Sequence, residues 1–533
     1  MRLGIRNIAI AIALFALAGS TAKPRLVVNV VVSGMRQTDL TRYEANFGQG
    51  GLRRLLAEGV EFSECYADYA PTTSEAGLAT LATGTLPATH GIFSSVRFDR
   101  TFNRKESLCY QPKPELKGVV MKSVEIERTV QPFVAPTLSE SVLNSSNRNR
   151  VVTIAHKPLS AMILSGRKGE CFWLNKEGKW MSADCYMEEL PTWVRNSNSD
   201  DMNRVYATDK WYGRFTRDRY RNSRSTDIIL YEKSGAKRSQ SNRKLSSSWV
   251  ADMMTMPSGN IAIFEFAKRA VESMLPLHVE DECKMINICL DVPRIVAERY
   301  GSDSVEYEDM LYSLDASLEE FLTFLYAQLK SREEAVVVLT SDGGMSPTQS
   351  ENSDSMRFNA RQFEVIINAF LSARYGQDAW VLGYADGSLY LNHDVIYKHK
   401  LSVEEVQNEA ATFALQYRGV VTAVTATAMR SAQFLRGTTA LLQNGYNPRR
   451  SGDVLLAFEV ERIELDTRRV AMSGSVYNYD RHIPFVISGG GVVPQRVTAR
   501  VNNEQIAPTL AAFMGVERPQ CADVEVLNIE RKK

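Results

Sequence analysis

The chain has 533 residues, with 63 Lys and Arg against 62 Asp and Glu, for a formal net charge of +1. This length predicts one large α/β domain with insertions, or two to three domains. The charge balance provides no electrostatic attraction to nucleic acid or to an anionic membrane, so neither is an expected partner.

The first 22 residues have the three-part pattern of a secretory signal peptide. Arg2 and Arg6 precede an apolar run at 8–18, and small residues follow through Ala22. The run is shorter than the roughly 20 apolar residues that a membrane-spanning helix needs, and no other stretch reaches that length. We therefore expect residues 1–22 to be removed and residues 23–533 to be exported to a bacterial periplasm or secreted, with no membrane span.

Apolar runs alternate with helical patterns along the rest of the chain. The first run, RLVVNVVV at 25–32, is rich in β-branched residues, as in a strand buried on both faces. Further strands of this kind are expected at 151–155, 285–290, 335–340 and 483–488. Helices are expected at 52–58, 261–273, 305–330, 363–374, 403–417 and 507–514. The alternation predicts the α/β class, with a doubly wound, mainly parallel sheet and helices on both faces.

Residues 196–244 differ in composition from their surroundings, being rich in Ser, Asn and Arg. We interpret them as part of an inserted cap region at about 157–257. The excess of Lys and Arg is consistent with a solvated surface or with a patch for an anionic partner. In a cap that binds a partner, the aromatic and Arg residues between Trp211 and Tyr220 would be the interface anchors.

Residues 69–91, reading YAPTTSEAGLATLATGTLPATHG, predict a loop that leads into a helix N-terminus. Pro71 fixes an extended approach, and Ser74 precedes a short apolar run that Gly84 closes. Free backbone N–H groups at such a terminus attract an anion. The Ser74 hydroxyl is therefore placed either to cap the helix or to attack or hold a phosphate.

Polar residues gather at the ends of the predicted strands. Ser33, Asp291 and Asp342 fall at or just after strand ends, and Ser74 follows another. Sites in doubly wound folds collect beyond the carboxyl ends of the strands. We expect these four residues to share one site.

Seven motifs follow one another between about residues 23 and 519. They read VVSGMR, PTTSEAG, ATGTLPATHGI, ICLD, VVVLTSDGG, YNYDRHIPFVISGG and IAPTLAAFMGV. In this order and spacing they resemble the alkaline phosphatase superfamily, in particular the branch of phosphate-irrepressible alkaline phosphatases and type I phosphodiesterases/nucleotide pyrophosphatases. The resemblance implies a doubly wound α/β domain with a cap, and phosphoryl transfer by two zinc ions that activate a Thr or Ser nucleophile.

The resemblance places the nucleophile on Ser74, where the hydroxyl is retained. It places retained metal ligands on Asp291, Asp342 and His482. The other metal positions fall on residues that offer neither carboxylate nor imidazole, namely Ser33, Ile295 and Gly343. One or two strong ligands do not make a tight zinc site, so we expect no metal or one divalent metal in place of two zinc ions.

The resemblance also implies changes in the phosphate-binding groups. The position of a family Asn falls on Ser95, and a Lys-x-Arg pair falls on Lys157 and Leu159. The guanidinium that would hold phosphate with two parallel hydrogen bonds is therefore lost. Ser95 and Lys157 remain candidates for substrate binding.

Three functions are compatible with these residues. The first is an exported pseudo-phosphatase that retains an anion-binding or scaffolding role, with a phosphate-bearing small molecule or a protein as its partner. The second is a metal-dependent phosphomonoesterase or phosphodiesterase in which Asp291, Asp342 and His482 converge on one ion beside Ser74. The third is an exported protein that binds a partner through its cap.

Other candidate residues are expected to be structural. His90 shapes the turn after the helix within 69–91. Asp480 orients the loop that carries His482. Asp315 and Glu319 lie on an exposed helix face.

Overall fold

The structure is a computed structural model, and it describes residues 23–99, 104–108, 126–127, 135–200, 202–208, 211–223, 249–275, 282–349, 357–465 and 469–532. The signal peptide expected at 1–22 lies outside these ranges and stays a prediction. Within the described ranges, no helix combines the length and the apolar character needed to cross a membrane.

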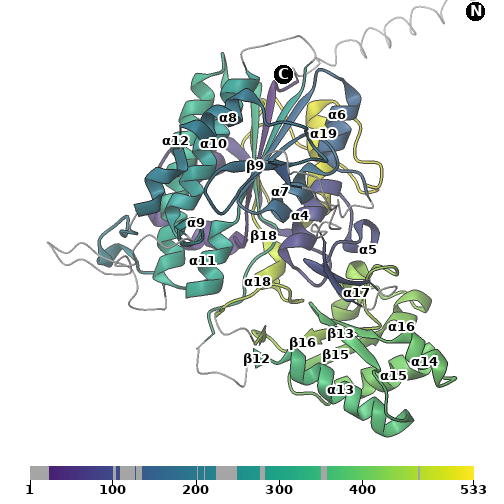
Figure 1. The fold of residues 1–533 in the computed structure, drawn as a ribbon. Helices are drawn as coiled ribbons and strands as arrows, with labels where there is room; N and C mark the ends of the chain where they lie inside the picture. The colour runs from purple at the N-terminus through teal and green to yellow at the C-terminus, as the bar shows by residue number, and fades with distance from the viewer. Residues whose placement is uncertain are drawn as a thin grey trace, which may run out of the picture.

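A ten-stranded sheet runs through the larger part of the molecule (Figure 1), in the order β20-β2-β19-β11-β1-β10-β7-β8-β9-β6. β1 (Leu26–Val32) pairs in parallel with β10 (Lys284–Leu290) and β11 (Ala335–Thr340), and β10 pairs in parallel with β7 (Arg150–Ala155). β19 (Phe485–Gly489) runs antiparallel to β11 and β2. The other strands are β2 (Gly59–Phe62), β6 (Ile126–Glu127), β8 (Glu170–Leu174), β9 (Trp180–Ala183) and β20 (Gln495–Val497). The predicted α/β class with a mainly parallel sheet is confirmed.

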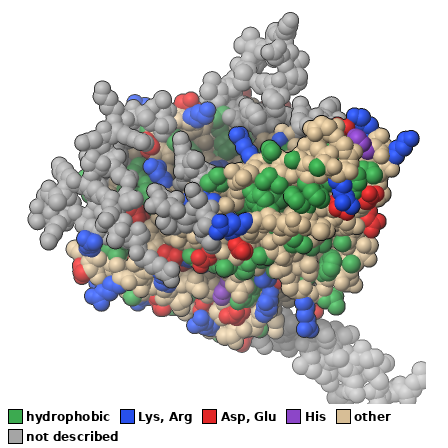
Figure 2. Space-filling model, turned by 90° about the horizontal axis from the view of Figure 1, so that it is seen from below, with side chains coloured by type: hydrophobic (Ala, Val, Ile, Leu, Met, Phe, Trp, Pro, Cys, Tyr) green, Lys and Arg blue, Asp and Glu red, His purple; other side chains and the backbone are tan. Residues whose placement is uncertain are grey.

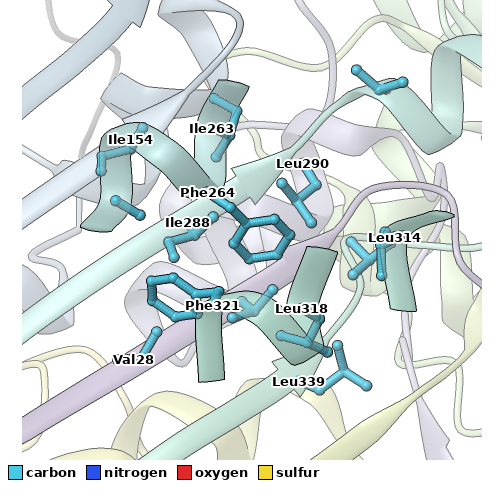
Figure 3. Close-up of a cluster of buried hydrophobic side chains, with 14 of the residues drawn as sticks. Val28, Ile154, Ile263, Phe264, Ile288, Leu290, Leu314, Leu318, Phe321 and Leu339 are labelled. Carbon is cyan, nitrogen blue, oxygen red and sulfur yellow. The ribbon is translucent and has the colours of Figure 1, made fainter. Parts of the chain in front are cut away.

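Helices cover both faces of this sheet, which is why its central strands are apolar without alternation. Val28 and Val30 of β1 belong to the core beneath one set of helices, and Val27 and Val31 belong to the core on the opposite face. The first set is α10 (Pro257–Met274), α11 (Val292–Tyr300) and α12 (Val305–Ala327). The second set is α4 (Ser74–Thr83), α6 (Leu138–Ser145), α7 (Pro158–Ser165) and α19 (Ile506–Met514). Figure 3 shows Phe264 of α10 beside Phe321 of α12 above the sheet.

Residues 357–465 form a smaller unit below the main sheet (Figure 1). Its four-stranded sheet has the order β13-β14-β16-β15 and its own core of buried side chains. The elements are β13 (Val381–Ala385), β14 (Ser388–Leu391), β15 (Val420–Thr425), β16 (Val454–Phe458), α13 (Ala360–Tyr375), α14 (His393–Lys398), α15 (Val403–Ala414), α16 (Ala426–Ser431) and α17 (Gly437–Gly445). On the face seen from below, basic and acidic side chains are interspersed among apolar ones (Figure 2).

The cap expected at about 157–257 is not a separate unit over its described part. α7, β8 and β9 continue the winding of the main sheet, and Trp193 of α8 (Thr192–Ser199) packs on Phe266 with ring centroids 4.9 Å apart. Two of its aromatic residues face inward, because Trp211 Nε1 donates to Asp309 of α12 at 2.6 Å and the Tyr220 hydroxyl bonds to the same carboxylate, whereas Tyr212 is 42% exposed. The unit inserted outside the main sheet is residues 357–465.

Short elements complete the region of the site. They are α2 (Gln37–Arg42), α3 (Leu52–Glu58), α5 (Pro87–His90), α18 (Asn478–Arg481), β3 (Cys65–Tyr66), β18 (His482–Ile483) and β21 (Val501–Asn502). β3 pairs with β18 and β21 in a separate three-stranded sheet.

Candidate functional site

Helix α4 begins directly after the extended segment that contains Pro71. Its N-cap is Thr73, whose Oγ1 accepts a hydrogen bond from the Ala76 amide at 3.2 Å and donates to the Phe93 carbonyl at 2.8 Å. Ser74 is the first helical residue, so its hydroxyl does not cap the helix and donates instead to Asp342 Oδ2. The sequence correctly predicts the helix N-terminus, but the capping role belongs to Thr73.

The carboxylate of Asp342 lies at the end of β11 and is only 1% exposed. Besides Ser74, Oδ2 accepts from Ser33 Oγ at 2.6 Å. Oδ1 accepts from the Gly34 amide at 3.0 Å and from Arg294 Nη2 at 2.9 Å. Both oxygens are therefore bonded to donors from the chain itself.

Arg294 is the cation of this cluster, and the sequence analysis missed it. The side chain extends from α11 and is buried; its Nε donates to Ser33 Oγ at 2.8 Å and its Nη1 donates to Ser473 Oγ. Burial alone would lower the pKa of Arg294, but the adjacent Asp342 carboxylate raises it above its ordinary value. One signal in the sequence could have indicated this residue. Arg294 lies in the first turns of a helix that directly follows a buried strand, and it immediately precedes Ile295, a metal position in the family.

Asp291 lies at the end of β10 and makes contacts different from those of Asp342. Its Oδ1 accepts from Ser160 Oγ at 2.7 Å, and its Oδ2 accepts from the Lys157 amide at 3.2 Å. His156 Nδ1 lies 3.8 Å from the same Oδ2, and burial lowers the pKa of His156. Asp291 therefore holds the N-terminus of α7, and the backbone of Lys157 serves this contact while its side chain is exposed.

His482 does not join the two aspartates. Its Nε2 donates to the Ser63 carbonyl at 2.7 Å, and its ring stacks on Tyr66 with centroids 4.5 Å apart. This placement follows from the pairing of β18 with β3, which sets His482 opposite Tyr66. In the part of the chain that the structure describes, no three His, Cys, Asp or Glu side chains are grouped to hold a metal. Asp291, Asp342 and His482 are therefore not grouped in the structure as their convergence on one ion would require.

The remaining candidate positions have ordinary packing roles. Ile295 is half-buried in α11, and Leu159 packs against the core beneath α4 and α7. The Ser95 carbonyl accepts from the Leu108 amide at 3.1 Å. Gly343 lies beside Arg294, since a Cβ built there would lie 3.7 Å from Nη2.

The described residues do not fit the two zinc ions that the family resemblance implies. Zinc binds carboxylate oxygens, imidazoles or thiolates, usually with three or four protein ligands. Asp342 instead binds a guanidinium and two hydroxyl groups, and a divalent ion on the same oxygens would be repelled by the Arg294 charge. Arg294 supplies the positive charge beside Asp342.

Comparison with known proteins extends this picture. The family described as type I phosphodiesterase / nucleotide pyrophosphatase matches residues 27–461. A protein named calcium-transporting ATPase from Myroides odoratus is 27% identical over 515 residues, 93% of each chain. Alkaline phosphatase PhoV from Synechococcus elongatus is 26% identical over 525 residues, 94% of this chain and 92% of PhoV. The crystal structure of alkaline phosphatase PafA, a protein of Elizabethkingia meningoseptica, superposes on this chain with a TM-score of 0.84 and 22% sequence identity. The superposition covers 96% of this chain and 99% of PafA, so the two proteins share the fold.

Proposed function

The chain belongs to the type I phosphodiesterase / nucleotide pyrophosphatase family, and from this premise we propose that it is an exported pseudo-phosphatase that binds a phosphate-bearing ligand without two-zinc hydrolysis. The observation that carries the proposal is the guanidinium of Arg294, bound to Asp342 Oδ1 at 2.9 Å and to Ser33 Oγ at 2.8 Å. Removing metal ions from a two-metal mechanism removes several kcal/mol of transition-state stabilisation. The retained Ser74 hydroxyl then serves binding and not attack.

The first turn of α4 supports the binding role. Ser74 is half-buried at the N-terminus of a ten-residue helix, where backbone N–H groups and the helix dipole favour an anion. The Arg294 charge offsets that of Asp342, so the carboxylate repels an arriving phosphate less than it would alone. The export part of the proposal is supported by the signal-peptide pattern at 1–22.

Two measurements on the purified chain 23–533 test the loss of hydrolysis. We expect the zinc content to be well below about one ion per chain, because each zinc site needs three or four ligands. We also expect no turnover of an aryl phosphate monoester or diester that depends on Ser74. Stoichiometric zinc, together with turnover that Ser74→Ala abolishes, would overturn the proposal.

Phosphate binding is tested separately by titration calorimetry with phenyl phosphate. The native chain is expected to bind phenyl phosphate. Ser74→Ala is expected to bind it at least about tenfold more weakly, a loss of about 1.4 kcal/mol in binding free energy. Ser431→Ala, an exposed helical Ser in α16, is the matched control and should bind as the native chain does. Equal affinity in all three proteins would leave Ser74 without a binding role and contradict this part.

A further inference from the structure

A cavity of about 70 Å³ lies where the main domain meets the 357–465 unit. Four parts of the chain line it: Ala70 and Pro71 ahead of α4, Ser346 after β11, the segment 472–476 with Tyr479 and Asp480, and residues of the smaller unit. Ser473 lines the cavity and also accepts a hydrogen bond from Arg294, so the cavity adjoins the site without containing Ser74 or Asp342.

The wall of this cavity carries more carboxylates than cations. Among the lining residues that the structure describes, the acidic ones are Asp386, Glu459, Glu464 and Asp480, and the single basic one is Arg462. Arg462 is already paired with Glu459 at 2.8 Å. Lys105 and Arg469 act on Asp386 and Glu464 from outside the lining, and Arg294 acts on Asp480. An anionic ligand is therefore disfavoured, and a cationic one is favoured.

Asp480 presents an unsatisfied acceptor in this wall. The residue is 0% exposed, and its Oδ2 accepts from the Ser475 amide at 2.7 Å. Its Oδ1 is buried without a hydrogen-bond partner among the described residues. A buried acceptor left unpaired carries a desolvation penalty, which is larger when the group is charged. A donor supplied by a ligand would remove this penalty.

The rest of the wall is apolar and aromatic. Phe358 and Phe458 both line the cavity, with ring centroids 4.5 Å apart, and Tyr384 lies 5.2 Å from Phe358. Ring faces attract cations that carry an apolar body, whereas a hydrated metal ion gains little from them. The carboxylates of the wall are also not grouped as metal ligands within the described ranges.

We propose that this cavity binds a small organic cation, an alkylammonium group whose N–H donors meet Asp480 and whose carbon body lies against Phe358 and Phe458. The cavity is distinct from the first turn of α4, so the inference stands whether or not the chain hydrolyses phosphate esters.

Titration calorimetry of the chain 23–533 at pH 8 tests the proposal with n-butylammonium chloride as the probe. The native chain should bind butylammonium, and Asp480→Asn, which keeps the shape but removes the charge, should bind at least about tenfold more weakly. Glu404→Gln, at an exposed residue of α15, is the matched control and should leave the affinity unchanged. Butan-1-ol, the neutral analogue, should not bind.

Glu464→Gln serves as a second variant if Asp480→Asn does not fold, and it is expected to weaken butylammonium binding in the same direction. Magnesium chloride is titrated in parallel. The proposal is overturned if butylammonium does not bind, if butan-1-ol binds equally well, if magnesium alone binds, or if the carboxylate variants bind butylammonium with native affinity. None of these outcomes depends on the zinc and phosphate measurements above.

Discussion

Arg294 decides the chemistry of the site at the scale of a single residue. A buried carboxylate such as Asp342 requires a counter-charge, because an isolated charge is costly to remove from water. Metal ions provide that charge in the chemistry that the resemblance implies, and in this chain a guanidinium provides it. The hydroxyl oxygens of Ser33 and Ser473 accept hydrogen bonds from two further nitrogens of the guanidinium.

Replacing Arg294 by Met should therefore destabilise the protein strongly. The substitution leaves Asp342 buried without its partner, and breaking a buried ion pair from one side costs about 3–5 kcal/mol. Denaturant unfolding of Arg294→Met measures the loss. The double variant Arg294→Met/Asp342→Asn is the control and should recover a large part of it, since it removes the stranded charge. A loss below about 1 kcal/mol in the single variant would show that Asp342 does not depend on Arg294.

His90, for which the sequence predicts a structural role in shaping a turn, is buried. Its Nδ1 accepts from the Ile92 amide at 3.1 Å, so Nε2 carries the proton and donates to Thr80 Oγ1 at 3.2 Å. Burial, with a smaller contribution from the Arg450 charge, lowers the pKa of His90 to about 3. The folded protein thus resists protonation of a group that titrates near pH 6.5 in the unfolded chain.

The pH dependence of stability follows from that shift. Because the pKa of the folded state is the lower one, the contribution of His90 is fully present above pH 6.5 and is lost as the pH falls toward 3. A single group of this kind lowers the free energy of unfolding by about 1 kcal/mol for each pH unit below 6. Urea unfolding between pH 7 and 5 should show this slope in the native chain and a shallower one in His90→Gln. Parallel slopes in the two proteins would contradict the assignment.

At the scale of elements, two neighbouring residues at the start of α4 have different roles: one caps the helix and the next bonds to Asp342. Thr73 caps the helix and also bonds to the loop at Phe93, which leaves Ser74 available for Asp342. Gly77 allows the helix to approach this carboxylate segment, since a Cβ there would lie 1.6 Å from the Asp342 carbonyl oxygen. The position of Ser74 thus depends on a cap before it and on a Gly after it.

Thr73→Ala should destabilise the protein by about 1 kcal/mol through the lost cap, with some further loss from the bond to Phe93. Thr73→Ser keeps an oxygen at the same place and should stay within about 0.5 kcal/mol of the native protein. Thermal unfolding of both variants checks the expectation. If the two variants are equally stable, the hydroxyl of Thr73 does not cap α4.

The sequence predicts the individual strands and helices better than it predicts which strands pair with one another. Periodicity and apolar runs correctly predicted β1, β7, β10 and β11, because strands buried on both faces have an unmistakable composition. They could not show that β19 runs antiparallel, or that β18 pairs with β3 and turns His482 toward Ser63. Pairing partners are chosen by long-range contacts that a short window does not contain.

Individual contacts were missed for the same reason. Asp315 was expected on an exposed helix face, yet it is 2% exposed and accepts from the Gly48 and Leu52 amides, each at 2.6 Å. Its partners precede it by more than 260 residues, so no helical pattern within α12 could have shown them.

At the scale of the whole molecule, the sequence predicts the class of the fold but does not indicate the smaller unit at 357–465. Residues 157–200 continue the main sheet, whereas residues 357–465 build a second sheet of their own. The helices expected at 363–374 and 403–417 are present as α13 and α15. The alternation of strands and helices along the sequence does not indicate which of the two sheets a strand joins. Composition therefore does not indicate the boundaries of the smaller unit.

The smaller unit is held to the main domain beside the approach to α4. The Ala70 amide donates to the Leu441 carbonyl at 2.9 Å, and Asn447 Nδ2 donates to the Ala88 carbonyl at 2.9 Å. Gly445 makes this approach possible at the end of α17, because a Cβ there would lie 1.7 Å from the Ala70 carbonyl oxygen. Ala70 also lines the cavity between the two units, so this contact fixes part of the cavity wall.

Gly445→Ala should consequently loosen the contact between the two units. Gly445 is the last residue of α17 and has no positive φ, so Ala fits its backbone and acts only through the clash with Ala70. Overpacking of this kind costs about 1–3 kcal/mol. Hydrogen exchange should show faster exchange of the Ala70 amide and of amides in α17, together with a lower unfolding temperature. Ala440→Gly, in the middle of the same helix, costs about 1 kcal/mol in helix propensity without a clash and is the control. It should leave the Ala70 amide protected, and equal exchange of that amide in the two variants would show that Gly445 does not hold the units together.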